Sequence, residues 1–235
     1  MPTTFLQDTD KTAAYPQQNN KAMLNIKKFV CNMFQENCYV VSDETNECVI
    51  IDCVARSETE RNGIADYIRD NGLKPRHLLC THAHIDHNFG NDFIFTTYGL
   101  RPTLHKADVC LYERLSEQAV YFTGSGYESS VKQPGTLLED GDTVAFGCHE
   151  FKIISTPGHS PGSVFLYCSD EKTAFSGDTL FRMSMGRTDL EGGDYDRIID
   201  SLTRITSALP EDTVVYPGHG PKTSIRDEKL MNPFF

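Results

Sequence analysis

Short runs of β-branched and aromatic residues, separated by polar turn segments, mark the chain after its first 22 residues. Three such runs predict strands at 24–31, 38–42 and 47–52. Ser57 and Glu60 have the spacing of a capping box, which predicts a helix that begins there and ends near Asn71 and Gly72. The pattern therefore predicts three strands followed by a helix.

The rest of the chain continues to alternate between strand and helix patterns. The middle predicts, in order, a buried strand at 77–81, a helix at about 87–98, a strand at 101–105, a helix at about 106–117 and a long loop at 118–135. Further strands are predicted at 143–146, 150–155, 163–168 and 173–176. An apolar helix face then precedes a strand at 213–216 and a short terminal helix, and this face consists of Ile198, Ile199, Leu202, Ile205 and Leu209.

Two groups of strands, each flanked by helices and not separated by a linker, predict an α+β fold. We expect a four-layer αββα sandwich, in which two sheets pack together and helices cover them outside. Residues 1–22 are too polar to offset their ordering entropy and are predicted to be a disordered tail, which leaves 23–235 as one domain. Met23 as the true start is the alternative. The loop at 118–135 is either a lid beside the functional site or a variable surface loop.

Charge and composition exclude several classes of partner. The formal net charge is −11 and the pI is near 5.1, whereas surfaces that bind nucleic acid are basic. No run reaches about 18 consecutive apolar residues, and the N-terminus lacks the basic start and apolar core of a signal peptide. We expect a cytoplasmic monomer or homodimer that binds neither nucleic acid nor membranes. The eight cysteines occur singly, and we interpret them as free core thiols, with one reactive thiol as the alternative.

Residues 80–90 read CTHAHIDHNFG and place three of the eight histidines within six positions after a predicted strand. His82 and His84 are two residues apart, so on an extended segment their imidazoles point the same way, and Asp86 and His87 follow at a helix start. Imidazoles with carboxylates suit zinc, iron or manganese, whereas magnesium and calcium prefer oxygen alone. The cluster predicts a metal site, with surface histidines beside a helix cap as the alternative.

Three further candidate ligands each follow an apolar strand: His159 in STPGHS, Asp178 in FSGDT and His219 in YPGHG. Glycine permits a tight turn next to a ligand, and α/β folds build sites at strand ends. A single histidine after a strand is more often structural. Together with the cluster at 80–90, however, the three positions predict one shared metal site.

This arrangement resembles the metallo-β-lactamase fold superfamily, whose pattern is HxHxDH followed by a later His, an Asp and a final His. The resemblance covers nearly the whole chain from residue 23 and implies two divalent metal ions, zinc in preference to iron or manganese. The implied ligands are His82, His84 and His159 for one ion, Asp86, His87 and His219 for the other, and Asp178 as the bridge.

Within the superfamily, the segments GDTLF, GRTDLEGGD and PGHGPK resemble single-domain glyoxalase II-like (hydroxyacylglutathione hydrolase-like) enzymes. The resemblance implies a metal-dependent hydrolase that cleaves a small-molecule thioester such as S-lactoylglutathione with a metal-bound hydroxide. Asp86 would be the catalytic residue that orients the water or carries its proton to the leaving thiolate.

Two further residues receive roles from the resemblance. Asp52 matches an aspartate that braces the histidine loop from behind, with an ordinary strand-end turn as the alternative. Arg187 lies nine residues after Asp178, where glyoxalase II enzymes place a lysine that contacts glutathione, and an arginine would clamp a substrate carboxylate. Alternatively, Arg187 holds Asp189 or a loop carbonyl.

The main competing function is an iron-dependent persulfide dioxygenase, which shares the fold and a GRTD-like segment. It would use two histidines and one carboxylate, namely His82, His159 and Asp178. The complete set of second-ion ligands favours hydrolysis. Lactonases and β-lactamases use the same ligands and stay open, whereas a binding module without activity is disfavoured because all seven ligand positions are filled.

Overall fold

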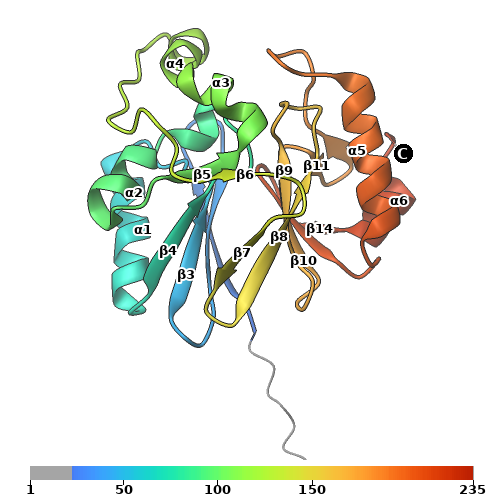
Figure 1. Ribbon diagram of the computed structural model, residues 1–235, viewed down its shortest axis with the longest axis horizontal. Coiled ribbons are helices and arrows are strands. Elements are labelled where there is room, and N and C mark those ends of the chain that lie inside the picture. The colour runs from blue at the N-terminus through green and yellow to red at the C-terminus, as the bar shows by residue number, and fades with distance from the viewer. Residues whose placement is uncertain (1–22, 235) are drawn as a thin grey trace, which may run out of the picture.

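Two six-stranded sheets pack face to face, and helices cover them on both outer sides (Figure 1). The computed structural model describes residues 23–234, so the predicted tail at 1–22 lies outside the described residues. The first sheet has the order β1-β2-β3-β4-β5-β6. Its strands are β1 Asn25–Cys31, β2 Glu36–Ser42, β3 Glu47–Ile51, β4 Lys74–Leu79, β5 Pro102–His105 and β6 Leu137–Leu138.

The second sheet has the order β14-β13-β10-β9-β8-β7. Its strands are β7 Thr143–Phe146, β8 His149–Ser155, β9 Val164–Cys168, β10 Thr173–Gly177, β13 Val214–Pro217 and β14 Thr223–Ser224. Neighbours run parallel from β3 to β6 in the first sheet and between β10 and β13 in the second. A separate small hairpin joins β11 Leu180–Phe181 to β12 Ser184–Met185.

The helices occupy three places around the sheets (Figure 1). Helices α1 Glu58–Asp70 and α2 Asn91–Tyr98 cover the outer face of the first sheet, and α5 Tyr195–Ala208 and α6 Ile225–Met231 cover that of the second. Helices α3 Val109–Glu113 and α4 Leu115–Thr123 lie at one end of the sandwich. The predicted capping box of α1 is present, since the Ser57 hydroxyl accepts from the Glu60 N–H and the Glu60 carboxylate accepts from the Ser57 N–H.

Alternating side chains of the central strands build the layers. In β2, Tyr39 and Val41 belong to the core between the sheets, whereas Cys38 and Val40 pack toward α1. Strand β9 repeats this in the second sheet, where Leu166 joins the inter-sheet core and Phe165 packs with α5. Because both faces of these strands are buried, they appear in the sequence as continuous apolar runs. The predicted four-layer αββα sandwich is confirmed.

Several predicted boundaries near α2 and α4 are wrong. The helix expected at 87–98 is a 3-10 turn at Ile85–Asn88 followed by α2, because the Gly90 N–H donates to the Cys53 carbonyl at 2.7 Å and not to a carbonyl of the preceding helical turn. The helix expected at 106–117 is a 3-10 turn at Lys106–Asp108 followed by two short helices. The second of these, α4, extends into the predicted loop at 118–135, because burial of Leu115 and Ala119 stabilises another helical turn.

The eight cysteines of the described chain are free thiols. Six are buried, as the prediction of small core residues requires, and burial raises the pKa of both Cys31 and Cys48 to about 12. For Cys110 and Cys148 the prediction is wrong, because their side chains are exposed.

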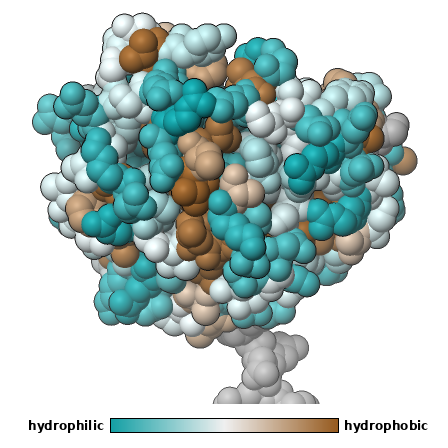
Figure 2. Space-filling view, turned by 45° about the horizontal axis from the view of Figure 1, so that its top comes forward, coloured by the Kyte–Doolittle hydropathy of each residue, from teal (hydrophilic) through white to brown (hydrophobic). Residues whose placement is uncertain are grey.

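Hydrophilic residues cover most of the surface in Figure 2, and exposed hydrophobic residues gather in a band along the middle of that face. Among residues 23–234, no helix combines the length and the apolar character that crossing a bilayer requires.

Candidate metal centre

The candidate site lies at one end of the sandwich, where strands of both sheets end. Asp52 follows β3, and the segment from Thr81 to His87 follows β4. In the second sheet, His159, Asp178 and His219 come after β8, β10 and β13. The strand ends therefore bring the seven predicted ligand residues together, although their strands are far apart in the chain.

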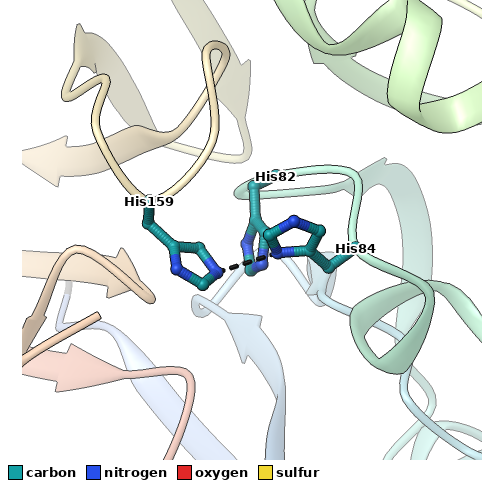
Figure 3. Close-up of side chains that lie close together, drawn as sticks. All are labelled: His82, His84 and His159. Atoms are coloured by element: carbon teal, nitrogen blue, oxygen red, sulfur yellow. Dashed lines mark hydrogen bonds between the residues drawn. The ribbon is translucent and has the colours of Figure 1, made fainter. Parts of the chain in front are cut away.

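Three imidazoles form the first donor group: His82, His84 and His159 (Figure 3). One nitrogen of each lies within 4.8 Å of the others, and all three side chains are buried. The closest pair is His84 Nδ1 and His159 Nε2, at 2.8 Å. Three nitrogen atoms that converge in this way are a donor set suited to zinc.

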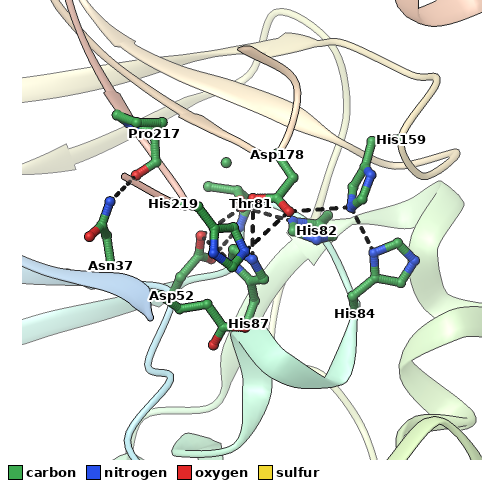
Figure 4. Close-up of polar contacts among 12 residues, drawn as sticks. Asn37, Asp52, Thr81, His82, His84, His87, His159, Asp178, Pro217 and His219 are labelled. Carbon is green, nitrogen blue, oxygen red and sulfur yellow. Dashed lines mark hydrogen bonds and ion pairs between the residues drawn. The ribbon is translucent and has the colours of Figure 1, made fainter. Parts of the chain in front are cut away.

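Two carboxylates and two imidazoles form the second donor group: Glu36, Asp86, His87 and His219. One ligand atom of each lies within 4.8 Å of the others. Asp178 lies between the two groups (Figure 4), with its carboxylate oxygens 3.3 Å from His87 Nε2, 3.6 Å from His159 Nε2 and 3.5 Å from His219 Nε2. Asp178 is therefore placed to contact ligands of both groups.

Hydrogen bonds occupy one nitrogen on each of His82, His159 and His219 and orient these rings. His159 Nδ1 donates to the carbonyl of Arg187 at 2.7 Å, and His219 Nδ1 lies 3.2 Å from the carbonyl of Phe34. The hydroxyl of Thr81 lies 3.1 Å from His82 Nδ1. In each case Nε2 faces the other donors, as in metal sites where an oxygen partner fixes the tautomer of a ligating histidine.

Burial and neighbouring charges divide the histidines by protonation. Burial lowers the pKa of His82 well below its usual range, and burial with the nearby His159 lowers the pKa of His84 to about 4. For His87, burial is outweighed by the carboxylates of Asp178 and Asp52, which raise its pKa well above the usual range. His82 and His84 thus offer neutral nitrogens, and the carboxylates make the second group favourable for a positive charge.

The buried donor atoms fit metal ions. His82 Nε2, His87 Nε2 and Asp178 Oδ1 are buried without a hydrogen bond to any described residue, although the last two atoms are only 3.3 Å apart. Buried polar atoms are almost always paired, because desolvation without a partner costs about 1–3 kcal/mol. Three such atoms around one space are explained by a cation that they share.

Asp52 lies behind the histidine loop, as the resemblance implies (Figure 4). Its carboxylate accepts from the Thr81 N–H and the Thr81 hydroxyl, both at 2.7 Å, and lies 3.1 Å from His87 Nδ1. Asp52 itself has a φ of 50°, a left-handed conformation that non-glycine residues rarely adopt. The strained backbone and the three contacts together favour the bracing role over an ordinary turn.

Asp108 was not predicted, and it connects the two histidine loops. Its buried carboxylate accepts from the Ala83 N–H at 2.9 Å, the Ser160 hydroxyl at 2.8 Å and the Gly162 N–H at 2.5 Å. Ala83 lies between two ligands of the first group, and Ser160 follows the third. The sequence carries no local signal for this role, because Asp108 looks like an ordinary helix-start aspartate.

Glu36 is the second residue that the sequence did not reveal. It lies at the start of β2, is fully buried, and accepts from Asn32 Nδ2 at 2.8 Å. Burial and the adjacent Asp86 carboxylate raise the pKa of Glu36 to about 9, while the pKa of Asp86 is lowered because His87 and Glu36 outweigh its burial. Glu36 lies between the two strands predicted at 24–31 and 38–42, where a polar residue is expected in a turn, so nothing in the sequence marks it.

Arg187 lines a cleft of about 390 Å³ that opens onto Asp86, His159 and Asp178. Its guanidinium binds Asp189 in a bidentate ion pair, with both contacts at 2.6 Å, and lowers the pKa of that carboxyl to about 2. The structure thus shows the alternative partner, and substrate binding by Arg187 stays a prediction. Its carbonyl has a separate role in orienting His159.

Residues 31–219 match the family described as the metallo-beta-lactamase superfamily. The chain belongs to this superfamily. It is 35% identical over 203 residues to the probable metallo-hydrolase YqgX of Bacillus subtilis, and the match covers 85% of this chain and 92% of YqgX. It is 32% identical over 212 residues to the hydroxyacylglutathione hydrolase GloC of Haemophilus influenzae, and the match covers 90% of this chain and 98% of GloC.

Two solved structures of superfamily proteins are also similar. TTHA1623, solved in a di-iron-bound form, is 36% identical with a TM-score of 0.78 and covers 89% of this chain and 100% of that one. ETHE1 from Myxococcus xanthus is 27% identical with a TM-score of 0.71, and the match covers 89% of this chain and 83% of the ETHE1 chain. Superfamily membership and the histidine cluster support a metal-dependent hydrolase and imply divalent metal ions.

Proposed function

We propose that the protein is a dinuclear metal hydrolase that cleaves a small-molecule thioester of the S-lactoylglutathione type in the cytoplasm, with zinc as the preferred ion. The observation that carries this proposal is the arrangement of the buried donors into two adjacent groups with Asp178 between them. Similarity to the hydroxyacylglutathione hydrolase GloC over 90% of the chain supports the thioester class.

Two bound divalent ions would supply Lewis acidity for the thioester carbonyl and lower the pKa of a shared water to about 7. The residues of the chain then have separate tasks. His82, His84 and His159 would hold one ion through imidazole nitrogens, and His87 and His219 would contribute to the other. Thr81, Phe34 and Arg187 keep the rings oriented through their oxygen atoms.

Asp86 is the candidate for proton transfer. Its pKa is lowered, so the carboxylate is ionised at neutral pH and can accept a proton from the attacking water. It also lines the cleft in which a substrate would bind. Delivery of that proton to the departing thiolate would complete the hydrolysis, and the reaction needs neither a serine nor a cysteine nucleophile.

The cleft offers a thioester both apolar and polar contacts. Phe34, Phe181 and Leu190 line it beside the ligands, and Arg187 lines it as well. A substrate carboxylate would have to compete with Asp189 for the guanidinium.

Turnover of S-lactoylglutathione by protein purified without chelators tests the proposal, with metal content measured on the same sample. We expect hydrolysis that a chelator abolishes and added zinc restores. The matched variant is Asp86→Asn, which keeps the shape of the side chain and should lose most of kcat even when turnover is measured at saturating metal. Metal-replete wild-type protein that leaves every tested thioester intact would refute the thioester substrate.

The second candidate is a persulfide dioxygenase, which the GRTD segment and the position of Asp178, 3.6 Å from His159 Nε2, favour. It would need one iron ion per chain and would consume oxygen with glutathione persulfide. An oxygen electrode separates the two functions, and oxygen uptake without thioester hydrolysis would select the dioxygenase.

A further inference from the structure

The second donor group contains one carboxylate that the pattern of seven residues does not include. Glu36 enters the site from the start of β2, where a backbone bridge pairs it with His219. The Asn37 N–H donates to the carbonyl of Gly218 at 2.8 Å beside this bridge. The same backbone contact therefore fixes Glu36 and His219 side by side.

The carboxyl group of Glu36 is only half satisfied by the protein. Oε2 accepts from Asn32 Nδ2 at 2.8 Å, while Oε1 is buried and has no hydrogen bond within 23–234. The residue is 0% exposed, so water does not reach it from the surface. A ligand atom of Glu36 lies within 4.8 Å of those of Asp86, His87 and His219.

The charge of two divalent ions favours a third carboxylate, Glu36, in the buried site. Two divalent ions bring four positive charges into a buried site, and burying uncompensated charge is costly. Asp86 and Asp178 offset two of these charges, and Glu36, once ionised by a bound cation, would offset a third. A cation would pair with both neighbouring carboxylates, Glu36 and Asp86, which otherwise repel each other.

We propose that Glu36 is a ligand of the second ion, which would then be held by two imidazoles and two carboxylates besides the shared Asp178, whereas three imidazoles would hold the first. Carboxylate oxygens suit hard ions such as manganese, whereas imidazole suits zinc. The ratio of manganese affinity to zinc affinity should therefore be higher at the second position than at the first. This inference rests on the two-ion centre of the proposed function and not on the thioester.

Cobalt titration of metal-free protein tests the ligand role, with calorimetry for affinity and the visible d–d bands for coordination. Wild-type protein should bind two equivalents with distinct spectra. Glu36→Gln, which keeps the size of the side chain, should weaken one equivalent by about 10-fold to 100-fold and leave the other unchanged. Two equivalents of wild-type affinity and spectrum in Glu36→Gln would overturn the proposal, as would a single equivalent in the wild type.

Glu228→Gln is the matched control, because Glu228 is another fully buried glutamate and belongs to α6 rather than to the donor groups. It should bind both equivalents as the wild type does. Equal losses in both variants would show a general effect of removing a buried carboxylate and would overturn the ligand role. Circular dichroism checks that each variant is folded.

A competition with wild-type protein keeps the proposal testable even if Glu36→Gln does not fold. Metal-free protein is loaded with two equivalents of manganese and titrated with zinc, and the released manganese is measured. Zinc should displace manganese from the first position at a lower concentration than from the second, and displacement of both ions at the same zinc concentration would overturn the difference in preference. If the metal-binding results are as expected but the protein does not hydrolyse thioesters, only the proposed substrate is refuted.

Discussion

Each end of the sandwich contains a buried aspartate–histidine pair, but the two pairs differ in what their other atoms contact. At the site end, Asp52 lies 3.1 Å from His87 Nδ1, and His87 Nε2 has no hydrogen bond among the described residues. At the opposite end, Asp43 lies 3.3 Å from His149 Nδ1 and joins the turn after β2 to the turn before β8. The same residue pair thus occurs in two different settings.

At the opposite end, groups of the protein itself supply the hydrogen-bond partners of Asp43. The carboxylate of Asp43 accepts from the N–H groups of Thr45 at 3.0 Å and Cys148 at 2.6 Å. Gly147 has a φ of 53°, and a Cβ atom there would lie 2.0 Å from Asp43 Oδ2, so the turn is built closely around this carboxylate. Unpartnered donor atoms, rather than the residue types, therefore distinguish a candidate metal site from a structural pair.

Asp178→Asn should reduce metal binding and turnover more than the other substitutions below. The carboxylate lies within 3.6 Å of one nitrogen on each of His87, His159 and His219, and the amide would remove its charge from all three contacts. Turnover should fall by about 100-fold or more, with loss of bound metal. Metal analysis and kcat measured on the same sample check this, and full metal content with normal kcat would contradict the role of Asp178.

Asp52→Asn should have the next largest effect. The amide can no longer accept from both groups of Thr81 and also hold His87, so the histidine loop loses its orientation. We expect metal affinity to fall by about 10-fold to 100-fold, as for other residues that orient ligands. Competition with a chromophoric chelator measures the affinity. An unchanged affinity would mean that packing alone orients the loop.

Arg187→Ala should have a smaller effect at the rim of the cleft. An exposed ion pair contributes about 0.2–1 kcal/mol, so loss of a comparable contact to substrate raises KM about 2-fold to 5-fold with kcat unchanged. Asp189→Asn frees the guanidinium and should lower KM for the same substrate. Steady-state kinetics with S-lactoylglutathione decide, and equal KM values in all three proteins would exclude Arg187 from substrate binding.

Asp43→Asn should have the smallest effect on catalysis and instead reduce stability. The loss of hydrogen bonds to a charged group should cost about 1–3 kcal/mol in the free energy of unfolding, with metal affinity unchanged. Urea unfolding and metal titration on the same variant check both statements. A large loss of metal affinity would erase the contrast between the two ends.

The pH dependence sharpens the prediction for Asp43. Burial raises its pKa, but hydrogen bonds from Thr45 and Cys148 outweigh burial and hold the pKa below the ordinary value of 3.8. A carboxyl with a lowered pKa stabilises the fold fully above its ordinary pKa, and this stability is lost as the pH falls through the lowered pKa. The difference in stability between wild type and Asp43→Asn should therefore be full at about pH 6 and shrink below about pH 3.

The sequence predicted the layers well because burial on both strand faces leaves a strong pattern. Runs such as those in β2 and β9 are apolar at every position that the two cores require. The seven candidate ligands could also be predicted, since each follows a strand or lies in one dense segment. Their role as ligands stays a prediction, and so does the substrate contact of Arg187.

The supporting residues could not be predicted because their roles exist only in three dimensions. Asp108 acts on two loops that come from different sheets, and Glu36 meets Asp86 only because β2 bridges to the turn before His219. The extent of α4 was missed for a related reason, since tertiary burial of Ala119 stabilises a helix that its own sequence does not mark.

Anomalous diffraction from crystals loaded with metal tests the central claim most directly. Our account predicts two peaks, one among His82, His84 and His159 and the other among Glu36, Asp86, His87 and His219, with Asp178 between them. Data from such crystals that show no ion at these side chains, or ions bound elsewhere, would contradict it.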